Sequence, residues 1–125
     1  MNIPPNLFYS ESHEWVLVES DIATIGITDY AQGELGDIVY FELPEVGSEA
    51  VKGEPFGTIE AVKTVADLYA PMSGTVAEIN GTLLGEPELA NQDPYGKGWI
   101  VKIGLSISVQ SKNLLSADEY SDLVG

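Results

Sequence analysis

The chain has 125 residues, with twenty Asp and Glu against five Lys and no Arg, which gives a formal net charge of −15. Its length and its 44% hydrophobic share predict one globular domain over residues 1–125. A surface this acidic repels phosphate backbones and anionic membranes, so we expect no nucleic-acid or membrane partner, and instead a monomer that docks on basic partner faces.

Short strands separated by Gly- and Pro-containing turns dominate the pattern. The predicted strands span residues 15–18, 22–27, 38–43, 55–60, 64–69, 74–79 and 99–103. The first two flank a short polar turn and are expected to pair as a β-hairpin. Many short strands joined by such turns predict a mainly β sandwich or flattened barrel.

One short helix is predicted in the N-terminal half. Thr28 is a good N-cap residue, Asp29 suits the first turn, and Gly36 can end the helix. We therefore expect helical residues between Thr28 and Leu35.

The C-terminal half has two weaker helical signals. Residues 83–98 are rich in Gly, Pro, Asn and Asp, which predicts a loop with one helical turn near residues 86–90. Ser116 and Glu119 have the spacing of a capping box, so a helix is expected over residues 116–124.

Patterns for catalysis are weak. Ser12 beside His13 suggests a Ser-His-Asp triad, but there is no G-x-S-x-G motif, and neighbours on a strand point to opposite faces. Phosphate-binding and calcium-binding loops are also missing. Cysteine is absent and His13 is the single histidine, which excludes disulfides, thiolate nucleophiles and the usual zinc sites.

Lys63 differs from the other lysines. Lys52, Lys97, Lys102 and Lys112 are each explained as solvated charges, Lys112 in the C-terminal loop. A faint similarity between residues 47–60 and 71–80 places Lys63 between two halves, at a hairpin tip if the strands on either side pair. A lysine held at such a tip is accessible to a ligase, as the attachment of a prosthetic group requires. From the residues alone, the interpretation as an ordinary surface lysine is favoured.

Several short blocks of the sequence follow one another in an order that is also found in a known protein family. They are Ser12-His13-Glu14-Trp15, residues 23–28, residues 35–39, Glu42-Leu43-Pro44, Glu60-Ala61-Val62-Lys63, residues 67–74 and residues 91–99. In this order and register the chain resembles the H proteins of the glycine cleavage system. The resemblance covers roughly residues 7–103 and thins over the tail.

This resemblance implies a hybrid barrel-sandwich of the biotinyl/lipoyl type, with a short helix in the N-terminal half and a C-terminal helix. It also implies that Lys63 carries lipoate in amide linkage, and that the chain is a non-catalytic carrier. The implied partners are glycine decarboxylase (P protein), which loads an aminomethyl group, aminomethyltransferase (T protein), dihydrolipoyl dehydrogenase (L protein), and a lipoate ligase or lipoyltransferase.

The matched blocks also suggest contacts for the loaded arm. Its terminal amine is cationic, so Glu14 and Asp67 are expected to accept the ammonium, with Ser12 nearby. Membership of an ordinary acidic surface explains both carboxylates equally well. Thr28 is expected to cap its helix rather than touch the arm. Because the chain has no cysteine, its redox sulfurs must arrive on a cofactor.

Four alternatives stay open at this point. A biotinyl carrier has the same fold, although biotinyl lysines usually sit between methionines, whereas Val62 and Thr64 flank Lys63. A lipoyl domain of a 2-oxoacid dehydrogenase is normally followed by a linker and a catalytic domain. An acidic interaction module would carry no cofactor, and a lipoyl relay would pass lipoate to other enzymes.

The N-terminal residues predict where the protein works. They lack the basic and apolar regions of a secretory signal and the Arg-rich pattern of a transit peptide. We expect a cytoplasmic protein, or one from an organelle matrix if a transit peptide has been removed.

Overall fold

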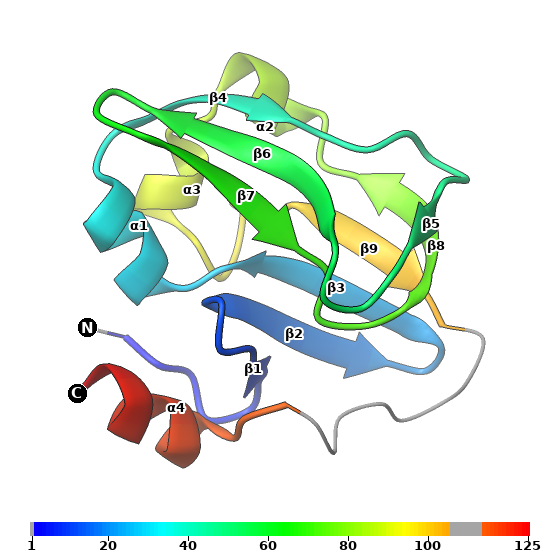
Figure 1. The fold of residues 1–125 in the computed structure, drawn as a ribbon, viewed down its shortest axis with the longest axis horizontal. Coiled ribbons are helices and arrows are strands. Elements are labelled where there is room, and N and C mark those ends of the chain that lie inside the picture. Colours follow the sequence, from blue (N-terminus) through cyan, green and yellow to red (C-terminus); the bar gives the residue numbers. More distant parts are fainter. Residues whose placement is uncertain (1, 106–113) are drawn as a thin grey trace.

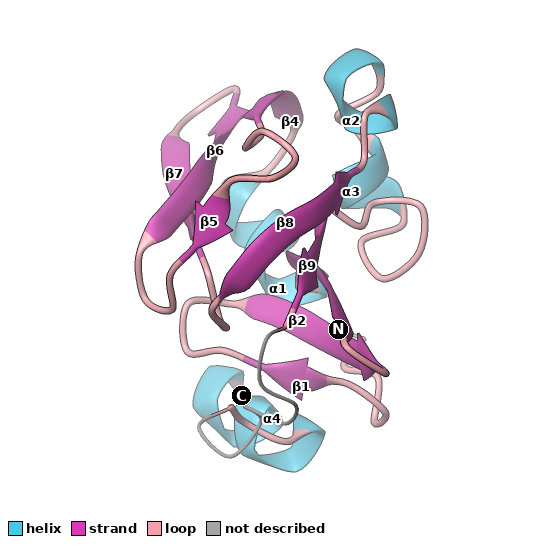
Figure 2. Ribbon diagram, turned by 90° about the vertical axis from the view of Figure 1, so that its right-hand side faces the viewer, coloured by secondary structure: helices cyan, strands magenta, loops and turns pink. Residues whose placement is uncertain are grey.

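The computed structural model describes residues 2–105 and 114–125, and its strands form two sheets (Figures 1 and 2). The six-stranded sheet has the order β1-β2-β3-β9-β8-β5, and the three-stranded sheet has the order β4-β6-β7. The strands are β1 Phe8–Tyr9, β2 Glu14–Glu19, β3 Ile22–Ile27, β4 Ile38–Glu42, β5 Glu49–Ala50, β6 Pro55–Ala61, β7 Val65–Tyr69, β8 Gly74–Ile79 and β9 Val101–Gly104. The helices are α1 Asp29–Leu35, α2 Thr82–Gly85, α3 Leu89–Gln92 and α4 Ala117–Val124. The predicted mainly β class is confirmed.

The N-terminal hairpin forms as predicted. β2 and β3 pair antiparallel, and Trp15 lies opposite Gly26. A Cβ on Gly26 would lie 2.6 Å from the indole Nε1 of Trp15, so the glycine leaves the space that this ring occupies. The indole N–H donates to the carbonyl of Pro94 over 2.9 Å and so ties the hairpin to the loop after α3.

Both predicted helix caps are confirmed. The Thr28 hydroxyl accepts a hydrogen bond from the Ala31 N–H at the start of α1. Ser116 and Glu119 form the reciprocal capping box at the start of α4, with bonds of 2.9 and 3.2 Å.

Other predicted boundaries were wrong. The single helical turn expected near residues 86–90 is replaced by α2 and α3, which flank a turn. β9 begins at Val101 rather than Trp99, and the two-residue strands β1 and β5 were not predicted. Of the two similar segments, 47–60 contributes β5 and β6, and 71–80 contributes β8, which pairs with β5 and lies in a different sheet from β6.

Two apolar clusters hold the fold together. The larger lies between the sheets, where Phe41, Ile59 and Leu68 of the three-stranded sheet belong to the same buried group as Ile25 and Ile103. The smaller, made of Leu7, Tyr9, Trp15 and Tyr120, lies where α4 packs beside β1 (Figure 1). Burying a large apolar side chain contributes roughly 1.5–3 kcal/mol, so α4 is fixed to the body by its buried tyrosine. In the described part of the chain, no helix is both long and apolar enough to cross a membrane.

Candidate functional site

Lys63 lies at the tip of the β6–β7 hairpin, as the sequence predicted. Glu60 pairs with Val65, and the Ala61 N–H donates to the carbonyl of Thr64 over 2.8 Å to close the turn. The Val62 N–H donates to the carbonyl of Asp37 over 3.0 Å, which attaches the tip to the segment after α1. Figure 1 shows this tip extending beyond the rest of the sheet, above α1. Lys63 is therefore exposed on a backbone that is held from two sides.

The stem of Lys63 rests over the C-terminal end of α1. A Cβ built on Gly36 would lie 3.4 Å from Lys63 Cε and 3.8 Å from its Nζ. The amide of Asn91, from α3, donates to the Gly36 carbonyl over 2.8 Å and accepts from the Ile38 N–H over 3.0 Å. Asn91 was not predicted as a functional residue, although it lies in the matched block of residues 91–99.

Replacing Gly36 with alanine is expected to lower the free energy of unfolding by about 1–3 kcal/mol, because its backbone (φ 76°, ψ −153°) is one that side chains rarely adopt. Gly33→Ala is the matched control, since Gly33 lies within α1 with nothing within 4 Å of a built Cβ. That change is expected to raise the same quantity by about 0.5–1 kcal/mol. Urea unfolding of both variants checks the pair, and equal effects would contradict the role given to Gly36.

A cavity of about 280 Å³, here called the α1 cleft, lies between α1, the start of β2 and the β6–β7 sheet. Its lining residues are Ser12, His13, Glu14, Ile27, Tyr30, Ala31, Glu34, Leu35, Ile59, Ala66, Asp67 and Leu68. All three predicted arm contacts, Ser12, Glu14 and Asp67, are among them. Leu35 directly precedes Gly36, so the cleft begins beside the place where the stem of Lys63 lies.

Glu14 is the buried carboxylate of the α1 cleft, with 2% of its surface exposed. Its Oε1 accepts hydrogen bonds of 2.5 Å from the hydroxyls of Ser10 and Ser12, and its Oε2 accepts from the Tyr69 N–H over 3.3 Å. Burial raises the pKa of Glu14, and these hydrogen bonds oppose the rise. Since all three donors are neutral, the charge of Glu14 is solvated but not balanced, which favours a cationic ligand.

Asp67 occupies the outer wall of the same cleft. It is exposed on β7 and pairs across the sheet with Thr58. Glu14 comes from the other sheet, so the two carboxylates reach one cavity from different layers of the fold. An amine entering the cleft meets the buried Glu14 and two exposed acids, Asp67 and, on α1, Glu34.

The structure contradicts the expectation that Ser12 and His13 sit on a strand. Both belong to a turn before β2, in which the Ser10 N–H donates to Glu14 O and the His13 N–H donates to Ser10 O. His13 has a φ of 72°, in the left-handed region. The Ser12 hydroxyl is directed to Glu14, and the ring of His13 bonds to Tyr120, so the two side chains are engaged separately and form no triad.

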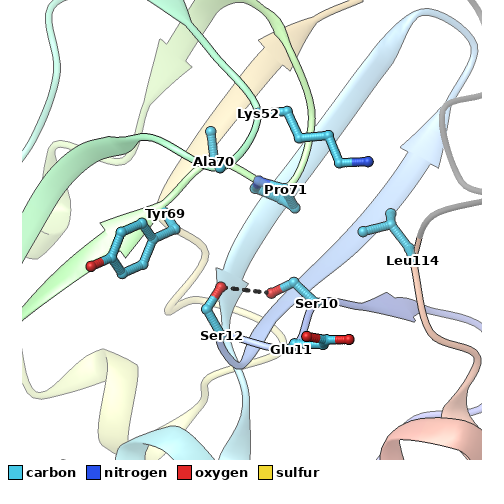
Figure 3. Close-up of a pocket in the computed structure, with 9 residues that line it drawn as sticks. Ser10, Glu11, Ser12, Lys52, Tyr69, Ala70, Pro71 and Leu114 are labelled. Carbon is cyan, nitrogen blue, oxygen red and sulfur yellow. Dashed lines mark hydrogen bonds between the residues drawn. The ribbon is translucent and has the colours of Figure 1, made fainter.

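A second cavity, of about 520 Å³ and here called the outer hollow, shares Ser12 with the α1 cleft (Figure 3). It is lined by Ser10, Glu11, Ser12, Lys52, Gly53, Tyr69, Ala70, Pro71 and Leu114. In Figure 3 the hydroxyls of Ser10 and Ser12 face each other, 3.3 Å apart. The same two hydroxyls donate to Glu14, so they lie between the outer hollow and the buried carboxylate.

The other lysines that the structure describes do not line the α1 cleft. Lys52 and Lys97 are exposed, in line with the interpretation as solvated charges. Lys102 differs, because its ammonium lies 5.1 Å from the centroid of the Trp99 ring, a cation–π contact that was not predicted. Lys112 lies outside the described residues. Within those residues, no group of three metal-ligating side chains comes together.

Comparison with known proteins identifies the family. The glycine cleavage H-protein family model matches residues 7–125, further than the resemblance to residue 103 noted in the sequence. The glycine cleavage system H protein of Staphylococcus haemolyticus is 55% identical over 125 residues, covering 100% of this chain and 99% of that protein. That of Rubrobacter xylanophilus is 56% identical over 119 residues, covering 95% and 92%.

A solved structure agrees with the sequence relatives. The crystal structure of a glycine cleavage system H protein from Mycobacterium marinum superposes with a TM-score of 0.87 at 37% identity, covering 96% of this chain and 97% of that one. The predicted hybrid barrel-sandwich fold is thereby confirmed. On the family match, the full-length relatives and this structural agreement, the chain belongs to the glycine cleavage H-protein family.

Proposed function

We propose that this chain is the lipoyl carrier of a glycine cleavage system and that Lys63 is the residue to which lipoate is attached. Membership of the H-protein family makes the chain a carrier component of that system. The observation that carries the residue assignment is the position of Lys63: it is exposed on a fixed hairpin tip, with its stem against the end of the helix that borders the α1 cleft.

The residues of the cleft fit such a group. When attached, lipoate supplies a redox-active disulfide on a long, largely apolar arm, and this chain has no cysteine of its own. Ile27, Leu35, Ile59 and Leu68 give the α1 cleft apolar walls along its length. The seven residues of α1 span roughly 10 Å, so a flexible arm fixed at one end of the helix can reach Glu14 near the other.

Glu14, Asp67 and Ser12 form the polar end of the cleft. We assign to Glu14 the binding of a terminal ammonium, because its neutral hydrogen-bond partners leave its negative charge unbalanced. Asp67 adds a second carboxylate from the outer wall. The role of Ser12 is to orient Glu14, since its hydroxyl donates to the Oε1 that would face the amine.

The reactions themselves belong to the partners in this proposal, and the carrier is not catalytic. Glycine decarboxylase would load the aminomethyl group, aminomethyltransferase would remove it, and dihydrolipoyl dehydrogenase would reoxidise the arm. A lipoate ligase or lipoyltransferase would modify Lys63 beforehand. With a net charge of −15, the carrier is expected to dock on basic faces of these enzymes, in the cytoplasm or in an organelle matrix.

Intact-protein and peptide mass spectrometry tests the assignment after incubation with lipoate, ATP and an active lipoate ligase. We expect one lipoyl adduct, on the peptide that contains Lys63, which takes two alkyl groups only after reduction. An adduct on Lys52 or Lys97 would overturn the residue assignment. Modification of Lys63 by a biotin ligase, and not by the lipoate ligase, would favour a biotinyl carrier. No adduct with either ligase would favour an acidic interaction module without a cofactor.

A further inference from the structure

The C-terminal helix reaches the α1 cleft through one buried hydroxyl. Tyr120, on α4, has none of its surface exposed. Its hydroxyl lies 2.9 Å from His13 Nδ1 and 2.7 Å from the Thr28 hydroxyl. One oxygen thus bonds to both the turn before β2 and the N-cap of α1. These partners lie 107 and 92 positions before Tyr120 in the chain, respectively.

One partner of this hydroxyl lines the cleft, and the other bonds to a residue that lines it. His13 lines the cleft directly, between Ser12 and Glu14 in the sequence. Thr28 caps α1 by accepting from the N–H of Ala31, which is also a lining residue. The Thr28 N–H also donates to the His13 carbonyl over 3.1 Å, so a change at the hydroxyl of Tyr120 reaches two neighbouring segments beside the cleft at once.

The geometry of His13 needs outside support. Its backbone φ of 72° costs a non-glycine residue of order 1–3 kcal/mol and persists only when the surroundings hold it. The imidazole packs against the rings of Tyr30, at 4.8 Å between centroids, and Tyr120, at 5.7 Å. Because Ser12 and Glu14 are its direct neighbours, the orientation of His13 sets the orientation of the hydroxyl and the carboxylate in the cleft.

The helix that carries Tyr120 is itself firmly placed. Leu115, just before α4, exchanges two backbone hydrogen bonds with Tyr9, of 2.8 and 2.7 Å. The rings of Tyr9 and Tyr120 stack with centroids 4.7 Å apart and 9° between their planes. The capping box of Ser116 fixes the first turn. Tyr120 is thus held independently of the cleft that it contacts.

We propose that Tyr120 is a positioning residue of the α1 cleft, whose hydroxyl holds His13 and the start of α1 in the arrangement that lets Ser12 and Glu14 receive the terminal amine. This inference rests on the proposed carrier function. Tyr120 touches neither the arm nor the amine and acts through the two side chains that it bonds. The C-terminal helix is then part of the site, although it lies at the far end of the chain.

The charged and titratable groups around His13 are few and come from three elements. Glu14 follows it on β2, Tyr30 and Glu34 face it from α1, and Tyr120 faces it from α4. Burial lowers the pKa of His13, and the charge of Glu34 opposes this shift. A neutral ring has two tautomers, and the hydrogen bond to Tyr120 restricts which one is populated.

Tyr120→Phe tests the inference, with Tyr9→Phe as its control. Both tyrosines are fully buried in the same stack, and each loses one hydroxyl, but that of Tyr9 donates to the Pro4 carbonyl over 2.6 Å, away from the cleft. In the unlipoylated protein, ¹⁵N NMR of the His13 ring should show a changed tautomer ratio in Tyr120→Phe alone. Tyr120→Phe loses both hydrogen bonds of the hydroxyl, to His13 and to Thr28. In the lipoylated, aminomethyl-loaded protein, the lifetime of the carried group should fall roughly fivefold in this variant, the factor expected when one hydrogen bond to the amine is weakened, and should stay unchanged in Tyr9→Phe.

Equal behaviour of the two variants, in both the NMR spectrum and the lifetime, would overturn the positioning role. Thr28→Val removes the hydrogen bond between Thr28 and Tyr120, together with the N-cap of α1, and should shift the His13 ring signals even if Tyr120→Phe does not fold. A wild-type protein that an active ligase does not lipoylate would instead contradict the carrier function, and the NMR comparison, which needs no lipoate, would still decide the role of Tyr120.

Discussion

Replacing Lys63 with arginine is expected to abolish glycine cleavage in a reconstituted system, down to the background of a mixture without this chain. Arginine keeps the positive charge and much of the length of lysine, but its guanidinium does not replace the lysine amine as the acceptor of a lipoyl group. Lys63 is exposed at the tip and the turn is closed by backbone bonds, so the variant should fold like the wild type. The release of labelled CO₂ from glycine measures the loss.

Lys97→Arg is the matched control, because it makes the same chemical change at another exposed lysine. It should keep full activity and full lipoylation. Circular dichroism of both variants checks that neither is unfolded. Cleavage by Lys63→Arg at the wild-type rate would refute the assignment of Lys63 as the attachment residue.

Replacing Glu14 with glutamine is expected to shorten the lifetime of the aminomethyl-loaded protein roughly 10- to 100-fold, the range for a hydrogen bond to a charged group. Glutamine has the same shape and can still accept from a serine hydroxyl, but it offers an ammonium no negative charge. Loss of the carried group, followed as released formaldehyde and ammonia, gives the lifetime. Glu11→Gln is the control, because Glu11 is exposed, lines the outer hollow and loses the same charge.

The pH dependence that Glu14 gives to the free energy of unfolding has a definite sign. Burial raises the pKa of Glu14, so the folded protein binds a proton there more tightly than the unfolded chain does. The contribution of Glu14 to the free energy of unfolding is therefore complete below its ordinary pKa and is lost as the pH rises through the raised value. The protection that Glu14 gives to the bound amine should instead increase with pH, since only the ionised carboxylate attracts the ammonium. Equal lifetimes for Glu14→Gln and wild type above the raised pKa, where Glu14 is ionised, would remove Glu14 from the site.

Local sequence signals were sufficient for the two capped helices and for the hairpin that holds Lys63. The N-cap of Thr28, the capping box of Ser116 and the strands around Lys63 all depend on neighbours within a few residues, and each formed as predicted. The two-residue strand β1 has no pattern of its own and exists because β2 and Leu115 pair with it. Such elements cannot be identified from periodicity.

The cleft depends on tertiary structure, and for this reason only parts of it were predicted. Glu14 and Asp67 were named from a family resemblance, whereas their shared cavity follows from two sheets facing each other. Nothing in the sequence pairs His13 with Tyr120, and the left-handed backbone of His13 has no local signal such as glycine. Asn91 was missed for the same reason, because its two backbone partners lie more than fifty residues away.

The hydrogen bond from Val62 to Asp37 has a consequence for how partners compete. A tip held on both flanks does not add its own motion to that of the arm, so the carried group explores a volume set by arm length alone. Every enzyme that docks within this radius then meets the group at a similar effective concentration, in the range that short flexible tethers give. On the proposed attachment to Lys63, we therefore expect competition between partners to depend on how strongly each docks on the acidic body, and not on the attachment point.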